Sequence, residues 1–329
     1  MVFNIQALRA LAALMVVFHH VILHADSYGV SLIYMNFLSG WGASGVDIFF
    51  VISGFVMVYT QMRVKRTPMG FLKNRIERIV PIYWLLTLVM VSLLLLMPAL
   101  FREKTFDLVW FVTSMTMTSQ FFTGSHPIIN VGWTLEYEML FYVLFACSLV
   151  LRGLFGTVLM TSALLGFVYL LGYSDAIIFE FMLGMGVAYA FRARIGAALG
   201  YPLLLAGGLL LGMSLIVELG WHRLFVWGVP AALIVMGACY VPQINNAMVL
   251  FLGEASYSIY LTHMFALPLI YKLAIRFLPS IQTDLLGLLC FVVAVAGGCV
   301  FYRCIEQPIT RRFKARRLVP EKAIYKEMA

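Results

Sequence analysis

The first residues that could do chemistry lie in an apolar stretch near the N-terminus, Leu8 to Leu23. The stretch is long enough to form most of a membrane-spanning helix, yet it carries Arg9 at its start and His19 and His20 deep inside. Ionisable residues within a membrane span are costly, so they usually face a protein interior or a water-filled cavity. Arg9 and His20 are separated by about three helical turns, so both project from one face about 16 Å apart along the axis. This helix alone fits either a functional site or a snorkelling arginine with a structural histidine.

A second candidate is a carboxylate, Asp47, which lies about two turns inside another apolar stretch. That stretch opens with the small residues Gly42, Ala43, Ser44 and Gly45, which allow close backbone approach to a neighbouring helix. A carboxylate there could orient the proton of a histidine or pair with a cation. Alternatively, Asp47 could cap the start of its helix.

A second carboxylate, Glu138, follows the polar opening of a later apolar stretch. It shares one helical face with Thr134 and Tyr142, whereas Glu136 is rotated away from that face. Because Glu138 lies about two turns inside the predicted span, we expect it to line a cavity or to have a polar partner. Glu136 is nearer the mouth of the span, and we expect it to be solvated.

Two arginines, Arg75 and Arg78, are three residues apart and therefore adjacent on a helical face. Two guanidinium groups held together suit phosphate recognition, because each offers a planar fork of donors. The alternative is that these charges set the topology and bind lipid headgroups, which the pair considered by itself favours.

A further histidine, His263, lies in a stretch that is rich in hydroxyl residues, Ser256 to Thr262. Hydroxyl groups on every face of a helix cannot all meet lipid, so this helix is expected to be central in the bundle. We expect His263 to be a hydrogen-bonded core histidine rather than a catalyst.

The composition identifies the class of protein that must position these groups. Hydrophobic residues make up 63% of the 329 and charged residues 12%, whereas soluble domains contain about a quarter charged residues. The apolar runs are continuous rather than alternating, which predicts an all-α integral membrane protein and not a barrel. The formal net charge of +8 favours anionic lipid headgroups or an anionic ligand. The five cysteines lack a C-x-x-C pair, so we expect neither a metal site nor a disulfide framework. We also expect no nucleic-acid partner.

Ten transmembrane helices are predicted, with both termini in the cytoplasm. The predicted spans are 7–25, 41–60, 79–98, 131–151, 154–172, 176–191, 199–218, 221–240, 252–275 and 284–303. The basic residues on the predicted cytoplasmic side are Arg63, Lys65, Arg66, Lys73, Arg75, Arg78, Arg152, Arg192, Arg194, Arg311, Arg312, Lys314, Arg316 and Arg317. Those on the opposite side are Arg102, Lys104, Arg223, Lys272 and Arg276. This asymmetry sets the orientation, because cytoplasmic loops carry the excess of Lys and Arg.

One apolar segment, residues 108–122, is too short and too rich in Ser and Thr to be counted as an eleventh span. We interpret it as a re-entrant or interfacial segment on the extracytoplasmic side. The chain shows no internal repeat or linker. It is therefore predicted to form one membrane domain, residues 1–317, followed by a polar cytoplasmic tail, residues 318–329.

Together these stretches resemble membrane acyltransferase family 3, the bacterial enzymes that O-acylate cell-surface glycans. Six motifs in family order carry the resemblance: Leu8-Arg9-Ala10 with His20, Gly45 to Phe55, Arg75-x-x-Arg78 with Pro81 and Tyr83, Trp133 to Tyr142, Ser256 to His263, and Glu306-x-Pro308. Within the family, the chain looks most like the exopolysaccharide (succinoglycan-type) acetyltransferases. Glu136 departs from the pattern, because a small or amide side chain is expected there.

The resemblance implies an acyl-CoA donor, usually acetyl-CoA, and a sugar hydroxyl acceptor on a polysaccharide or its lipid-linked oligosaccharide precursor. By position, His20 is the expected catalytic histidine, and Arg9, Arg75 and Arg78 lie on the CoA side. Asp47 and Glu138 become candidates to orient His20 or to bind the acceptor sugar. The resemblance places the enzyme in the bacterial cytoplasmic membrane, among lipids and polysaccharide-assembly proteins.

Two other classes of protein would use a similar polar cavity. A transporter for glycans or lipid-linked oligosaccharides is the first, but it would favour inverted repeats and paired broken helices, which the sequence lacks. An unrelated membrane acyltransferase that modifies lipids or proteins is the second. Turnover of acetyl-CoA with and without glycan separates these alternatives.

Overall fold

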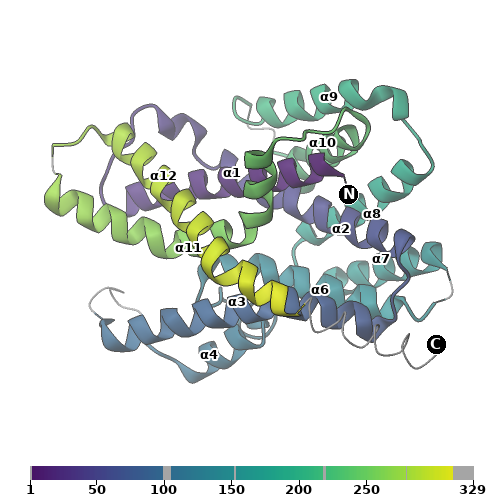
Figure 1. The fold of residues 1–329 in the computed structure, drawn as a ribbon, viewed down its shortest axis with the longest axis horizontal. Coiled ribbons are helices and arrows are strands. Elements are labelled where there is room, and N and C mark those ends of the chain that lie inside the picture. Colours follow the sequence, from purple (N-terminus) through teal and green to yellow (C-terminus); the bar gives the residue numbers. More distant parts are fainter. Residues whose placement is uncertain (1, 99–104, 152, 218–219, 279, 314–329) are drawn as a thin grey trace, which may run out of the picture.

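The computed structural model describes residues 2–98, 105–151, 153–217, 220–278 and 280–313, and this part of the chain is helical without strands (Figure 1). The helices are α1 Phe3–Ser27, α2 Gly45–Arg63, α3 Pro68–Leu96, α4 Leu108–Met115, α5 Ser119–Thr123, α6 Trp133–Ser148, α7 Leu154–Leu170, α8 Phe179–Arg192, α9 Gly200–Met213, α10 Val229–Tyr240, α11 Ala247–Phe277 and α12 Thr283–Phe301. Two short π-helical segments, Leu224–Gly228 and Tyr302–Glu306, precede α10 and follow α12. Wider helical turns of this kind are frequent at functional sites.

Five helical segments of the described chain are long and apolar enough to cross a bilayer. They are Phe3–Ser27, Met35–Arg63, Pro68–Leu96, Ala247–Phe277 and Thr283–Phe313. A sixth candidate is the pair Ala176–Arg192 and Ala197–Met213, which are bent by 114° relative to each other. The prediction of an all-α polytopic membrane protein is confirmed. Each of the ten predicted spans overlaps a helix, but whether all ten cross the membrane stays a prediction.

Helix α1 packs against α2 on one side and against α11 and α12 on the other (Figure 1). Glycines allow this close packing, since a Cβ on Gly45 would lie 2.4 Å from the carbonyl oxygen of Ala12, and one on Gly253 2.2 Å from that of Gln6. The small residues before α2 were predicted to permit such an approach, and this prediction is confirmed. Residues of α1 can therefore contact both α2 and α11.

A second close crossing joins α2 to α8. A Cβ on Gly54 would lie 2.1 Å from the carbonyl oxygen of Phe181, and one on Gly184 would lie 2.0 Å from that of Val51. The two helix backbones are thus in direct contact, which is possible only where both helices have glycine. The crossing brings the first turns of α2 and α8 together, and each of these turns carries a carboxylate, Asp47 or Glu180.

The segment predicted to be re-entrant or interfacial forms two short helices, α4 and α5, separated by a turn in which Met117 has a φ of 56°. Glu136 of α6 is fully buried, and its carboxylate accepts hydrogen bonds from the backbone N–H groups of Ser119 (3.0 Å) and Gln120 (2.8 Å). The expectation that Glu136 is solvated was wrong, because the first turn of α5 covers it and uses it as a cap. Its position at the extracytoplasmic side of the membrane stays a prediction.

Several sequence predictions fall on residues outside the described part. They concern the tail, residues 318–329, and six of the topology-setting charges, Arg102, Lys104, Arg152, Lys314, Arg316 and Arg317.

Candidate active site

Three arginines that the sequence singled out, Arg9, Arg75 and Arg78, come together in space. They line two cavities, which meet at these arginines. We call the three residues the arginine cluster, the smaller cavity of about 100 Å³ the narrow cavity, and the larger cavity of about 490 Å³ the wide cavity.

The wide cavity is lined by the N-terminal parts of α1, α3 and α11 and by the end of the helical segment Thr283–Phe313, which we call the α12 segment. Besides the arginine cluster, its charged lining residues are Arg66, Glu77, Glu254, Glu306 and Arg311. Five guanidinium groups around one open cavity suit a ligand with several phosphates, because arginine binds phosphate through two parallel hydrogen bonds. This end of the helices is the predicted cytoplasmic side.

One buried donor of Arg75, its Nε atom, lacks a hydrogen-bond acceptor among the described residues. The guanidinium carbon lies 5.8 Å from the ring centroids of both Phe71 and Tyr142, so aromatic rings hold the side chain in place. Buried donors are almost always satisfied in folded proteins, so this donor is available to an acceptor that the protein does not supply, such as a ligand oxygen or a water molecule in the cavity.

The narrow cavity contains Glu138, as the sequence predicted for a carboxylate two turns inside a span. Glu138 accepts hydrogen bonds from the hydroxyl of Ser53 (2.7 Å) and from the hydroxyl of Tyr142. Neither bond involves His20. Glu138 therefore lies with the arginine cluster rather than with the histidine that it was a candidate to orient.

His20 lies beside His263 of α11, with the two ring centroids 4.8 Å apart. The Nδ1 atoms of both histidines contact backbone carbonyls of their own helices, that of Val16 at 2.9 Å and that of Ile259 at 3.3 Å. A carbonyl oxygen only accepts, so each Nδ1 carries the hydrogen and each neutral imidazole keeps Nε2 as an acceptor. The Nε2 of His263 is buried and has no partner in the described structure. The pair therefore has two unprotonated ring nitrogens, Nε2 of His20 and Nε2 of His263.

His263 is the expected hydrogen-bonded core histidine, yet it is also the neighbour of His20 that sequence reasoning did not assign. The signal lay in its position on a central helix, but the sequence does not say which face of α11 meets α1. Tyr260 connects the histidines to the donor side: it lines the narrow cavity, and its ring centroid is 6.0 Å from that of His263. His20 itself does not line either cavity.

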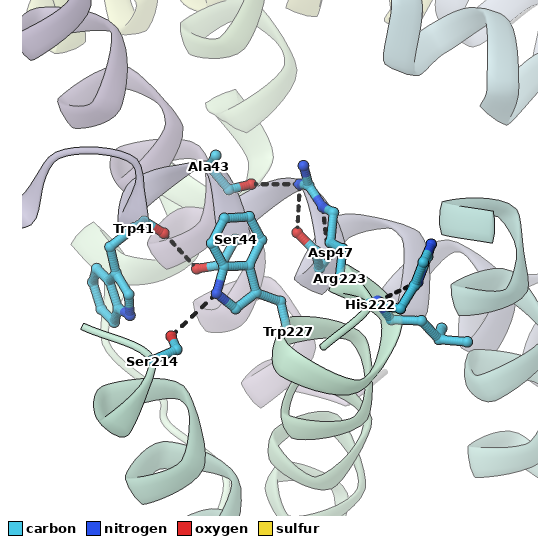
Figure 2. A network of polar contacts seen from close by, with 9 residues as sticks. Trp41, Ala43, Ser44, Asp47, Ser214, His222, Arg223 and Trp227 are labelled. Atoms are coloured by element: carbon cyan, nitrogen blue, oxygen red, sulfur yellow. Dashed lines mark hydrogen bonds and ion pairs between the residues drawn. The ribbon is translucent and has the colours of Figure 1, made fainter. Parts of the chain in front are cut away.

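Asp47 is fully buried and forms an ion pair with Arg223 rather than with a histidine (Figure 2). Arg223 donates from Nε to Oδ1 (3.0 Å) and from Nη2 to Oδ2 (2.7 Å), so the contact is bidentate. The structure therefore agrees with the alternative in which Asp47 pairs with a cation. The Asp47 side chain does not cap the start of α2. Arg223 appeared in the sequence only as a charge on the predicted outer side. Its departure from the positive-inside rule was the one signal of a separate role.

Comparison with known proteins places the chain in a family. The family described as an acyltransferase domain (acyltransferase family 3) matches residues 2–303, which is nearly the whole chain. The chain belongs to this acyltransferase family. It is also 33% identical over 300 residues to the exopolysaccharide production protein ExoZ of Rhizobium meliloti (strain 1021), an alignment that covers 84% of this chain and 92% of that protein. No solved structure matches the chain.

The chain is thus an acyltransferase and a multi-pass membrane protein, and its family implies an acyl donor. In this acyltransferase the arginine cluster comes from α1 and α3, and the histidine pair comes from α1 and α11. Within the described residues, no three His, Cys, Asp or Glu side chains gather as a metal ligand set would. Helix α1 is the element that the two groups share.

Proposed function

We propose that this acyltransferase transfers an acetyl group from acetyl-CoA to a sugar hydroxyl of an exopolysaccharide or of its lipid-linked precursor. The observation that carries the proposal is the convergence of Arg9, Arg75 and Arg78 where the two cavities meet. The similarity to an exopolysaccharide production protein supports a polysaccharide as the acceptor. The proposed location is a bacterial cytoplasmic membrane.

The two cavities fit the two ends of the donor. The wide cavity, with its five arginines, suits the phosphorylated nucleotide end of CoA. The narrow cavity is too small for a nucleotide but suits the slender acylated arm, and much of its lining is apolar, including Val46, Ile52 and Met57. The buried Nε of Arg75 would then donate to an oxygen of the donor where the cavities meet.

His20 supplies the chemistry in this proposal. Its Nε2 would accept the proton of the acceptor hydroxyl while the hydroxyl oxygen attacks the thioester carbonyl carbon. The new C–O bond forms, the C–S bond breaks, and the proton returns to the sulfur of CoA. Alternatively, Nε2 carries the acetyl group briefly before the sugar oxygen takes it. Both routes need an unprotonated Nε2, which the hydrogen bond from Nδ1 to Val16 provides.

The proposal is tested on the polysaccharide of the host bacterium. Mass spectrometry of the exopolysaccharide, with and without this chain, should show a loss of 42 Da, about the mass of one acetyl substituent, per modified repeat. Restoring the wild-type chain should restore the acetyl group, whereas the His20→Ala variant should not. An identical acetylation pattern with and without the chain would refute the proposed function.

A further inference from the structure

Three ionisable side chains meet at the end of the molecule opposite the wide cavity. Asp47 lies in the first turn of α2, Glu180 in the first turn of α8, and Arg223 just before the π-helical segment Leu224–Gly228. The wide cavity, by contrast, includes Arg66, which lies beyond the other end of α2. The three side chains, which we call the outer triad, are therefore on the side from which an extracytoplasmic acceptor would arrive.

Arg223 is held in one orientation from several directions. Its Nε and Nη2 donate to the carboxylate of Asp47, Nη2 also donates to the carbonyl oxygen of Ala43 (3.2 Å), and the ring of Trp227 lies 4.7 Å from the guanidinium carbon (Figure 2). Nη1 takes part in no hydrogen bond within the described structure. The Arg223 side chain is 33% exposed, so this fixed guanidinium keeps a donor that a ligand can reach.

The surroundings of Arg223 connect it to the histidine pair. His19, the residue before His20, and Tyr260, the neighbour of His263, are both close enough to interact electrostatically with the guanidinium. Arg223 thus lies near His19, which precedes His20 in the chain, and near Tyr260, whose ring is beside that of His263.

Glu180 explains how Asp47 stays in place. Glu180 is fully buried and lies beside Asp47, and neither of its carboxylate oxygens accepts a hydrogen bond from the residues that the structure describes. Gly228 makes room for it, because a Cβ there would lie 3.0 Å from Glu180 Oε1. Two buried carboxylates beside one guanidinium would leave an uncompensated charge, which is costly. One proton shared by Glu180 and Asp47 removes that cost and supplies the missing hydrogen bond.

We propose that Arg223 binds the acceptor sugar, donating from Nη1 to a sugar oxygen so that the reacting hydroxyl faces His20. Asp47 and Glu180 are positioning residues: Asp47 holds the guanidinium, and Glu180, as the protonated acid, donates to Asp47. The inference rests on the proposed function, because it assumes a glycan acceptor that enters from this side. It assigns specificity for the acceptor to residues that line neither the narrow nor the wide cavity.

The test uses purified full-length enzyme in lipid nanodiscs, acetyl-CoA, and exopolysaccharide oligosaccharides from which the acetyl groups were removed by mild base. Arg223→Lys keeps the charge but loses the fork, so KM for the oligosaccharide should rise about tenfold or more, while KM for acetyl-CoA changes less than twofold. Arg276→Gln is the matched control, since Arg276 is an exposed arginine at the same end of the molecule, in the last turn of α11. It should leave both KM values unchanged.

Positioning by Glu180 is tested by conservative rescue. Glu180→Ala should raise KM for the oligosaccharide, and Glu180→Gln, which keeps a donor for Asp47, should restore most of the loss. An unchanged oligosaccharide KM in Arg223→Lys, or equal rises for both substrates, would overturn the inference and leave the proposed function standing. Failure of the wild-type enzyme to acetylate the oligosaccharides would instead refute the proposed function itself.

Discussion

At the scale of single residues, the structure assigns partners that spacing alone could not. Arg9 and His20 were predicted to share a face of one helix, but their neighbours on α3 and α11 are visible only in the fold. Arg75 is the most informative of these side chains, because its buried Nε lacks an acceptor and lies where two cavities meet. We interpret the arginine cluster as a binding site for donor phosphates rather than as a topology signal alone.

This interpretation predicts a selective effect on the donor. Replacing both Arg75 and Arg78 with Gln should raise KM for acetyl-CoA about 100-fold or more, because each of the two lost charge-assisted hydrogen bonds contributes about 1.5–3 kcal/mol. KM for the glycan should change little. Lys73→Gln on the same helix is the control, since its side chain is 69% exposed and pairs only loosely with Glu77 at 3.9 Å. Steady-state kinetics check the prediction, and an unaltered donor KM in the double variant would leave the pair with a topological role only.

At the scale of elements, the contact between α2 and α8 fixes the outer triad. Gly54→Ala would place a methyl group 2.1 Å from a backbone oxygen, so the helices must move apart. We expect the variant to be destabilised by about 1–3 kcal/mol, as for other overpacked cores. Gly186→Ala on the same α8 is the control: its Cβ would meet nothing within 4 Å, and alanine favours a helix by about 1 kcal/mol over glycine. Thermal unfolding in detergent should give the highest midpoint for Gly186→Ala, an intermediate one for the wild type and the lowest for Gly54→Ala. Equal midpoints would contradict the close packing of α2 against α8.

The elements also show what could be predicted from the sequence. Helix positions follow from continuous apolar runs, and close approach of α1 and α2 follows from Gly42 and Gly45, because both signals are local. Partners distant in sequence were not predictable. Asp47 and Arg223 are joined across 176 positions, and Glu136 is buried by a short helix whose docking no periodicity encodes.

At the scale of the whole molecule, our proposals give the enzyme a donor end at the wide cavity and an acceptor end at the outer triad. This division requires the predicted orientation, in which the N-terminus of α1 and the end of the α12 segment share the cytoplasmic side. The excess of Lys and Arg at that end is the physical reason for it. An enzyme of this kind can use a cytoplasmic thioester to modify a glycan on the other side of the membrane.

The orientation has its own test. A topology reporter fused after residue 317 should report the cytoplasm, and one inserted near Gly124, after α5, should report the opposite side. In the predicted topology an even number of crossings separates the two termini, whereas an odd number separates Gly124 from either of them. If both reporters give the same side, the ten-span count and the interpretation of residues 108–122 are both wrong.

The central claim is that His20 of α1 transfers acetyl from a donor held by the arginine cluster, and purified enzyme tests it most directly. Acetyl-CoA labelled in the acetyl group is supplied with de-O-acetylated glycan, and labelled glycan is measured by mass spectrometry. The account predicts transfer by wild type, a loss of at least about 100-fold in His20→Ala, and unchanged binding of acetyl-CoA by that variant. His19 precedes His20 and projects from a helical face turned by about 100°, so His19→Ala should keep most of the activity. Labelling of glycan by His20→Ala at the wild-type rate would contradict the account.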